Sequence, residues 1–141
     1  NGDMYLCIVM EEYPVKVLLA FGETFKGNPE LHRWLMENGY EELGLLSSCI
    51  RGDMKACEWL LKNGYPEFAA LDSAIDHKPE AYLWLRKNGF DILAVFADAC
   101  NRKKEAAQWL IDNDLNIFLH LADCINAFRD NQYFDYHKKR F

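Results

Sequence analysis

The four tryptophans of this 141-residue chain are evenly spaced. They stand at intervals of 25 residues, each inside a related phrase such as "CEWLLKNGY" or "YLWLRKNGF". A constant spacing of this kind indicates a repeat array. The matched columns are Trp34, Trp59, Trp84 and Trp109; Leu35, Leu60, Leu85 and Leu110; Asn38, Asn63, Asn88 and Asn113; Tyr40, Tyr65, Phe90 and Leu115; and Cys49, Ala74, Ala99 and Cys124.

Each unit contains two short helical patterns. The first, as in residues 28–39, opens with Pro29, which is tolerated at a helix start, and places Trp34 among apolar residues at three- and four-residue spacing. An Asn-Gly pair then ends it, because glycine adopts the left-handed conformation of a helix C-terminus. The second pattern, as in residues 66–76, carries Phe68 on an apolar face. No stretch shows the alternation of a strand, so the sequence predicts an all-α fold.

Helix pairs this short cannot bury their own apolar faces, so the units must stack. We therefore expect one domain, an α-solenoid of stacked helix-turn-helix repeats that runs as a linear stack. Each tryptophan shares an apolar stripe with its leucine, which favours a place in the repeat core over a site that stacks bases or cations. Phe134 stands one period further on and is assigned to the same core. The expected boundaries are 1–27 for a divergent N-terminal unit, 28–52, 53–77, 78–102 and 103–127 for the repeats, and 128–141 for a C-terminal capping helix.

The segment "RGDMKACEWLLKNG", residues 51–64, resembles the second-helix phrase of ankyrin repeats. It has a glycine, an acidic residue and then an apolar helix that ends in glycine. Ankyrin units are about 33 residues long and open with Thr-Pro-Leu-His, which is absent here. Compared with an ankyrin unit, the 25-residue unit lacks the residues that would form the projecting β-hairpin. The resemblance implies a right-handed stack without fingers, whose inner helices line a concave face that binds another protein.

Charge and cysteine usage narrow the class of protein further. The formal net charge of −6 disfavours nucleic acid, which is bound through clustered lysine and arginine. The apolar runs fall well short of the roughly 18 to 20 residues that span a bilayer, and no basic-then-apolar leader opens the chain. Cys49 and Cys124 share a column with alanines, and the five cysteines are an odd number. We therefore expect five buried or free thiols in a soluble protein of the cytoplasm or another intracellular compartment.

The histidines and cysteines are the residues most able to form a catalytic or metal-binding motif. The four histidines form no HExxH pair, and neither CxxC nor a Cys-His ligand spacing occurs. Pairing Cys100 with His77, or Cys124 with His120, as nucleophile and base is disfavoured because the cysteines occupy repeat columns. We therefore predict no enzyme, no catalytic residue, no metal, no cofactor and no small-molecule substrate.

Recognition in a repeat protein is expected from the exposed columns that vary between units. On the second helices, the side opposite the core is small and partly acidic. The candidate partner-binding residues are Ser47, Arg51, Asp72, Asp76, Asp98, Asn101, Asp123 and Asn126.

These residues predict a non-enzymatic protein-protein interaction module that presents a concave, mildly acidic surface to a protein or peptide, with a basic segment favoured. Two alternatives stay open at this point. The stripe is equally consistent with a solvated helix face. The array is also consistent with a structural section or spacer of a longer helical-repeat protein that self-associates through its ends.

Overall fold

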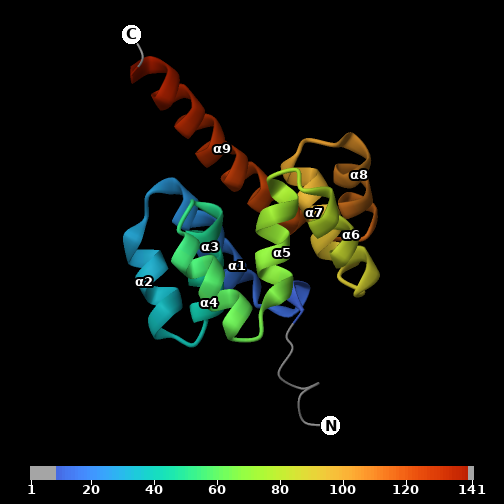
Figure 1. Cartoon of the computed structure of the whole chain (residues 1–141), viewed down its shortest axis with the longest axis horizontal. Helices are drawn as coiled ribbons and strands as arrows, with labels where there is room; N and C mark the ends of the chain where they lie inside the picture. The colour runs from blue at the N-terminus through green and yellow to red at the C-terminus, as the bar shows by residue number, and fades with distance from the viewer. Residues whose placement is uncertain (1–8, 140–141) are drawn as a thin grey trace.

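The computed structural model describes the backbone of residues 9–139 and the side chains of residues 9–132. Within this range the regular structure is helical and contains no strand, so the predicted all-α class is confirmed (Figure 1). None of the helices in the described part of the chain is both long enough and apolar enough to cross a membrane.

The helices fall into two alternating sets, which we call outer and inner. The outer helices, nine residues each, are α2 (Pro29–Glu37), α4 (Met54–Lys62), α6 (Pro79–Lys87) and α8 (Lys104–Asp112). The inner helices are α1 (Val15–Glu23), α3 (Glu41–Ile50), α5 (Pro66–Ile75), α7 (Asp91–Cys100) and α9 (Asn116–Lys139). Two short 3-10 turns, η2 (Met10–Glu12) and η3 (Thr24–Lys26), flank α1.

The turns explain the asparagine and glycine columns. After the first three outer helices the chain reverses through Gly39, Gly64 and Gly89, whose φ angles are 88°, 89° and 81°. The predicted helix stops are thus confirmed, and Asp114 takes the same left-handed conformation at φ 58° after α8. Each asparagine of the preceding column donates its side-chain N–H to the carbonyl of the tryptophan four residues earlier, at 2.8 Å in all four cases. The backbone N–H groups of Asn63, Asn88 and Asn113 donate to the same carbonyls, so in these units the amide adds a second hydrogen bond at the end of the helix.

The leucine column forms the core, and the tryptophans lie at its edge. Every member of the leucine column has an exposed fraction of 0%. Trp34, Trp84 and Trp109 are 37–40% exposed, so their assignment to the repeat core is wrong, while Trp59 is half-buried. The side chain of Phe134 lies outside the described residues.

The tryptophan rings pack on the turns instead of between repeats. Trp34, Trp59 and Trp84 stack on Tyr40, Tyr65 and Phe90, with ring centroids 5.8–6.1 Å apart. The residue that follows the Asn-Gly turn folds back over the indole and covers one of its faces. These three contacts stabilise the turns after α2, α4 and α6.

The inner helices form a closed ring, and the predicted linear stack is wrong. Along the chain α3 packs on α5, α5 on α7 and α7 on α9, and α9 returns to pack on α1. Phe25 of η3 meets Phe128 of α9 edge to face, with 6.1 Å between ring centroids. The first and last inner helices are therefore neighbours, and the faces that the inner helices share form the centre of the protein.

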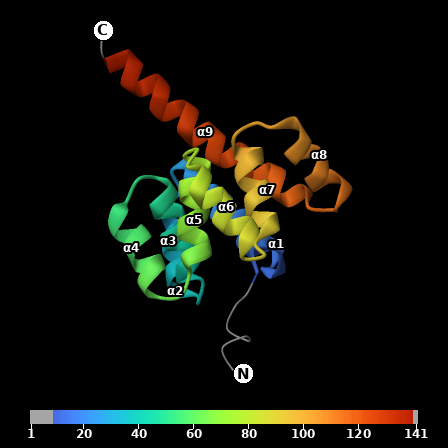
Figure 2. The same cartoon turned by 45° about the vertical axis from the view of Figure 1, so that its right-hand side comes forward.

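The predicted separate capping helix is absent. Helix α9 continues without a break from Asn116 to Lys139, so residues 128–139 prolong the last inner helix. Its C-terminal part projects from the body of the protein (Figure 1 and Figure 2).

Candidate functional site

Closure of the ring buries part of the stripe that was predicted to bind a partner. Ser47 is 0% exposed, and its hydroxyl lies 2.6 Å from Thr24 Oγ1 in a hydrogen bond. Asn126 is also buried, and its Oδ1 accepts a hydrogen bond from Arg129 at 3.4 Å. Ser47 is therefore inaccessible to a partner and its assignment to the binding surface is wrong, whereas Asn126 keeps an exposed fraction of 7%. The cause is the contact between inner helices, which turns this face inward.

The remaining candidates differ in exposure. The half-buried ones are Arg51, Asp72, Asp98 and Asn101, and the exposed ones are Asp76 and Asp123. Internal contacts engage three of the half-buried residues. Arg51 Nε donates to Ser47 Oγ at 3.1 Å, Asn101 Nδ2 donates to Ala74 O at 3.4 Å, and Asp98 pairs with Lys103 at 3.3 Å. The structure therefore does not gather the eight residues into one acidic groove.

Open grooves lie instead beside the outer helices. Figure 2 shows α4 and α8 on opposite sides of the body, with α5 and α7 between them. One groove of about 490 Å³ has Ala69, Ala70 and Ser73 of α5 in its lining, with Leu61 and Trp84 on either side. We call this the α5 groove.

Two further grooves are equivalent to each other, because most of their lining residues stand 25 positions apart. The α7 groove, of about 360 Å³, includes Asp98 and Asn101 in its lining. The α9 groove, of about 410 Å³, includes Asp123 and Asn126. Asp98 and Asp123 thus lie in the linings of neighbouring outward grooves, which makes them the predicted acidic residues best placed to meet a partner.

A disulfide joins Cys49 of α3 to Cys57 of α4, with 4.9 Å between the Cα atoms. The prediction of five free thiols is therefore wrong. Because α3 and α4 pack together across the turn between them, residues eight positions apart face each other.

Cys100 and Cys124 are free and buried, and Cys7 lies outside the described residues. Burial raises the pKa of the Cys100 thiol to about 12. Burial also raises the pKa of Cys124, whose sulfur lies 3.6 Å from His120 Nε2. A thiol with a raised pKa is a poor nucleophile at neutral pH, because the thiolate is the reactive form.

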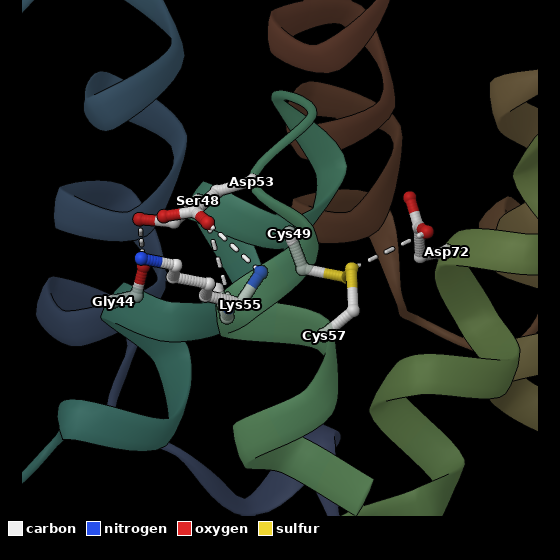
Figure 3. Close-up of a disulfide and its surroundings, with 8 residues drawn as sticks. Gly44, Ser48, Cys49, Asp53, Lys55, Cys57 and Asp72 are labelled. Carbon is white, nitrogen blue, oxygen red and sulfur yellow. Dashed lines mark hydrogen bonds between the residues drawn. A yellow bond between two sulfur atoms is a disulfide. The ribbon is translucent and has the colours of Figure 1, made fainter.

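Asp72 of α5 completes a cluster around the disulfide (Figure 3). Its Oδ2 lies 3.9 Å from Cys57 Sγ, and the ligand atoms of Cys49, Cys57 and Asp72 all lie within 4.8 Å of one another. Burial, reinforced by the negative charge of Asp76 and partly offset by Lys78, raises the pKa of Asp72 from 3.8 to about 6. The three residues are 8 and 15 positions apart, so a search for local ligand spacings missed them.

Comparisons with known proteins add no family to this description. No protein-family model, no curated protein and no solved structure matches the chain.

Proposed function

We propose that this chain is a non-enzymatic protein-binding module of the helical-repeat class, built from 25-residue units and similar to ankyrin repeats without their β-hairpins. The regular placement of the helices supports the period. The outer helices begin at Pro29, Met54, Pro79 and Lys104, at the same interval as the tryptophans. The binding surface of the module is the set of outward grooves, because the inner helices cover their inner faces by packing on one another.

The observation that carries this proposal is the pairing of open grooves with exposed apolar side chains. Leu61 and Leu83 are 59% and 64% exposed, and each lines a groove that also contains small residues. Trp84 offers an indole at the edge of the α5 groove. Aromatic and aliphatic side chains around a concave surface are the usual anchors of a protein interface.

The partner is expected to be a protein or peptide segment that combines apolar anchors with lysine or arginine. Asp98 and Asp123 supply the complementary charge, and the formal net charge of −6 favours the approach of a basic segment. Lys103 competes for Asp98 within the chain, so a basic partner must displace it. The Lys103 side chain is 60% exposed and exchanges readily with water, so its displacement from Asp98 costs little.

The packing of α1 on α9 favours a binding module over a spacer in a longer solenoid. A solenoid grows by adding units to exposed terminal faces. Here the first and last inner helices pack on each other. Additional units would have to separate them.

A peptide selection tests this function. A phage-displayed random peptide library is selected on the immobilised chain, and the enriched peptides are synthesised and titrated by fluorescence anisotropy. We expect them to contain an apolar residue close to lysine or arginine. Their affinity should fall in the Asp98→Asn/Asp123→Asn variant and fall as salt rises, because screening weakens exposed charge pairs.

The matched control changes charges that lie away from the grooves. Glu58, Lys62 and Lys87 are exposed on the outer helices and line none of the three grooves. Replacing all three by glutamine should leave peptide affinity unchanged. If this variant loses binding while the double asparagine variant binds normally, the partner contacts the outer helices and the groove assignment is wrong.

A further inference from the structure

Asp72 stands out in a column of small residues. The equivalent positions in the other units are Gly22, Ser47, Ala97 and Ala122, all of them buried. Asp72 is the only charged residue of this column, and it is half-buried. Placing a carboxylate there costs desolvation free energy, which the repeat architecture itself does not require.

The sulfur atoms of Cys49 and Cys57 are the chemical neighbours of this carboxylate. In the disulfide, Cys57 Sγ has no proton, so it cannot donate a hydrogen bond to Asp72 Oδ2 at 3.9 Å. Reduction changes this, because a thiol or thiolate then faces the carboxylate. In the reduced form, two sulfur atoms able to bind a ligand therefore lie beside the carboxylate, whereas in the oxidised form the two sulfur atoms are bonded to each other.

Three successive helices hold the cluster in place. Cys49 is carried by α3, Cys57 by α4 and Asp72 by α5, and these helices pack on one another. Figure 3 shows the Asp53 carboxylate at the start of α4, where it accepts hydrogen bonds from the backbone N–H groups of Lys55 and Ala56 at 3.0 and 3.4 Å. This cap fixes the first turn of the helix that carries Cys57.

The spacing of the three side chains suits a tetrahedral metal ion. Zinc binds thiolate sulfur at about 2.3 Å and carboxylate oxygen at about 2.0–2.2 Å, so its ligands lie roughly 3.4–3.8 Å from one another. The ligand atoms here all lie within 4.8 Å of one another, so small side-chain rotations after reduction bring them to those distances. Two soft thiolates select zinc over magnesium or calcium. Cys49 is buried, whereas Cys57 and Asp72 are half-buried and leave the ion a route from solvent.

We propose that the reduced protein binds one Zn²⁺ through Cys49 Sγ, Cys57 Sγ and the Asp72 carboxylate, and that the disulfide is the form that cannot bind zinc. A dithiol reductant breaks the Cys49–Cys57 bond, supplies two electrons and two protons, and becomes a disulfide itself. Zinc then displaces one proton from each thiol. Three protein ligands leave a fourth position for water or for a side chain of a partner.

Metal titration of the full chain tests the proposal. The protein is reduced with a phosphine, which is removed anaerobically, and Zn²⁺ is added in competition with a chromophoric chelator. We expect one equivalent to bind to the reduced chain and none to the oxidised chain. Co²⁺ substitution should give thiolate charge-transfer absorption, and X-ray absorption at the zinc edge should report two sulfur and two lighter ligands.

Single substitutions assign the ligands. Cys57→Ser should abolish binding, and Asp72→Asn should weaken it at least about tenfold. Cys124→Ser and Asp123→Asn are matched controls that should bind as the parent does, and circular dichroism verifies that each variant is folded. Absence of zinc binding by the reduced chain would overturn the proposal. So would full affinity in Cys57→Ser or Asp72→Asn, or an absorption spectrum of the parent without two sulfur ligands.

Discussion

Gly22 offers a direct test of ring closure, because it lies in α1 where α9 crosses. A Cβ added at Gly22 would lie 3.0 Å from Leu121 Cδ2 and 3.2 Å from Cys124 Sγ, both of α9. In an open linear stack α9 would be remote from α1, and this glycine would face solvent or a neighbouring unit. The sign of the stability change on enlarging Gly22 therefore distinguishes the two arrangements.

The magnitude follows from two opposing effects. Replacing a helical glycine by alanine stabilises the helix by about 0.5–1 kcal/mol, and valine recovers roughly half of that. Overfilling a packed contact costs about 1–3 kcal/mol. Gly22→Ala should therefore be close to neutral, since a shift of a few tenths of an ångström relieves its contacts. Gly22→Val places two more methyl groups against α9 and should lower the free energy of unfolding by about 2 kcal/mol.

Urea unfolding followed by circular dichroism measures this change, with the m-value checked for constancy. Gly44→Ala is the control, because its Cβ would meet Met36 Sδ and Cγ, atoms of a flexible side chain within α2, and the helix gains the same propensity. Leu121→Ala in the Gly22→Val background should recover part of the loss through non-additivity. A stabilised Gly22→Val variant, or strictly additive effects with Leu121→Ala, would refute the packing of α1 on α9.

Other predictions concern the core, the cysteines and Asp72. Leu85→Ala should lower the free energy of unfolding by about 3 kcal/mol, because it leaves a sealed cavity. Trp84→Ala should lower it by about 2 kcal/mol, because water fills the space left by the partly exposed indole. Denaturant titration compares the two variants. Thiol titration after denaturation should find two fewer groups without reductant than with it, and equal counts would contradict the Cys49–Cys57 bond. The pKa of Asp72 is raised from 3.8 to about 6 in the folded state, so the folded protein binds the proton more tightly and loses stability as pH rises through this window. Unfolding of the oxidised chain from pH 3.5 to 7 should therefore show a loss of roughly 2 kcal/mol that is absent in Asp72→Asn, and identical pH profiles would show that this carboxylate titrates normally.

Much of the local structure could be predicted from the sequence. The apolar spacing around Leu35 and its equivalents predicted the outer helices, and the Asn-Gly pairs predicted where they stop. Both features depend on residues within one or two turns of each other, so their physical causes lie inside a short segment. The position of the tryptophans was harder to predict, because each tryptophan shares its apolar stripe with the next leucine. The leucine points to the core, and the tryptophan lies over a turn.

The candidate site depended on contacts that no single segment contains. Ser47 and Asp72 stand in the same repeat column, yet one is sealed inside the ring and the other borders a disulfide. Cys49 and Cys57 stand in different columns, and only the packing of α3 on α4 brings them together. One sequence signal could have pointed to the site: Asp72 is the only charged residue in its repeat column.

The sequence by itself determined the helices, their order and the turns between them, because periodic burial, helix stops and left-handed turn residues are local properties of the chain. Tertiary structure alone decided that the inner helices close into a ring, which faces remain open, and that two thiol-bearing residues and a carboxylate meet. The curvature of a repeat array follows from the small rotation between successive units. A slight change in that rotation, accumulated over the units, separates an open stack with a concave groove from a ring whose first and last helices touch.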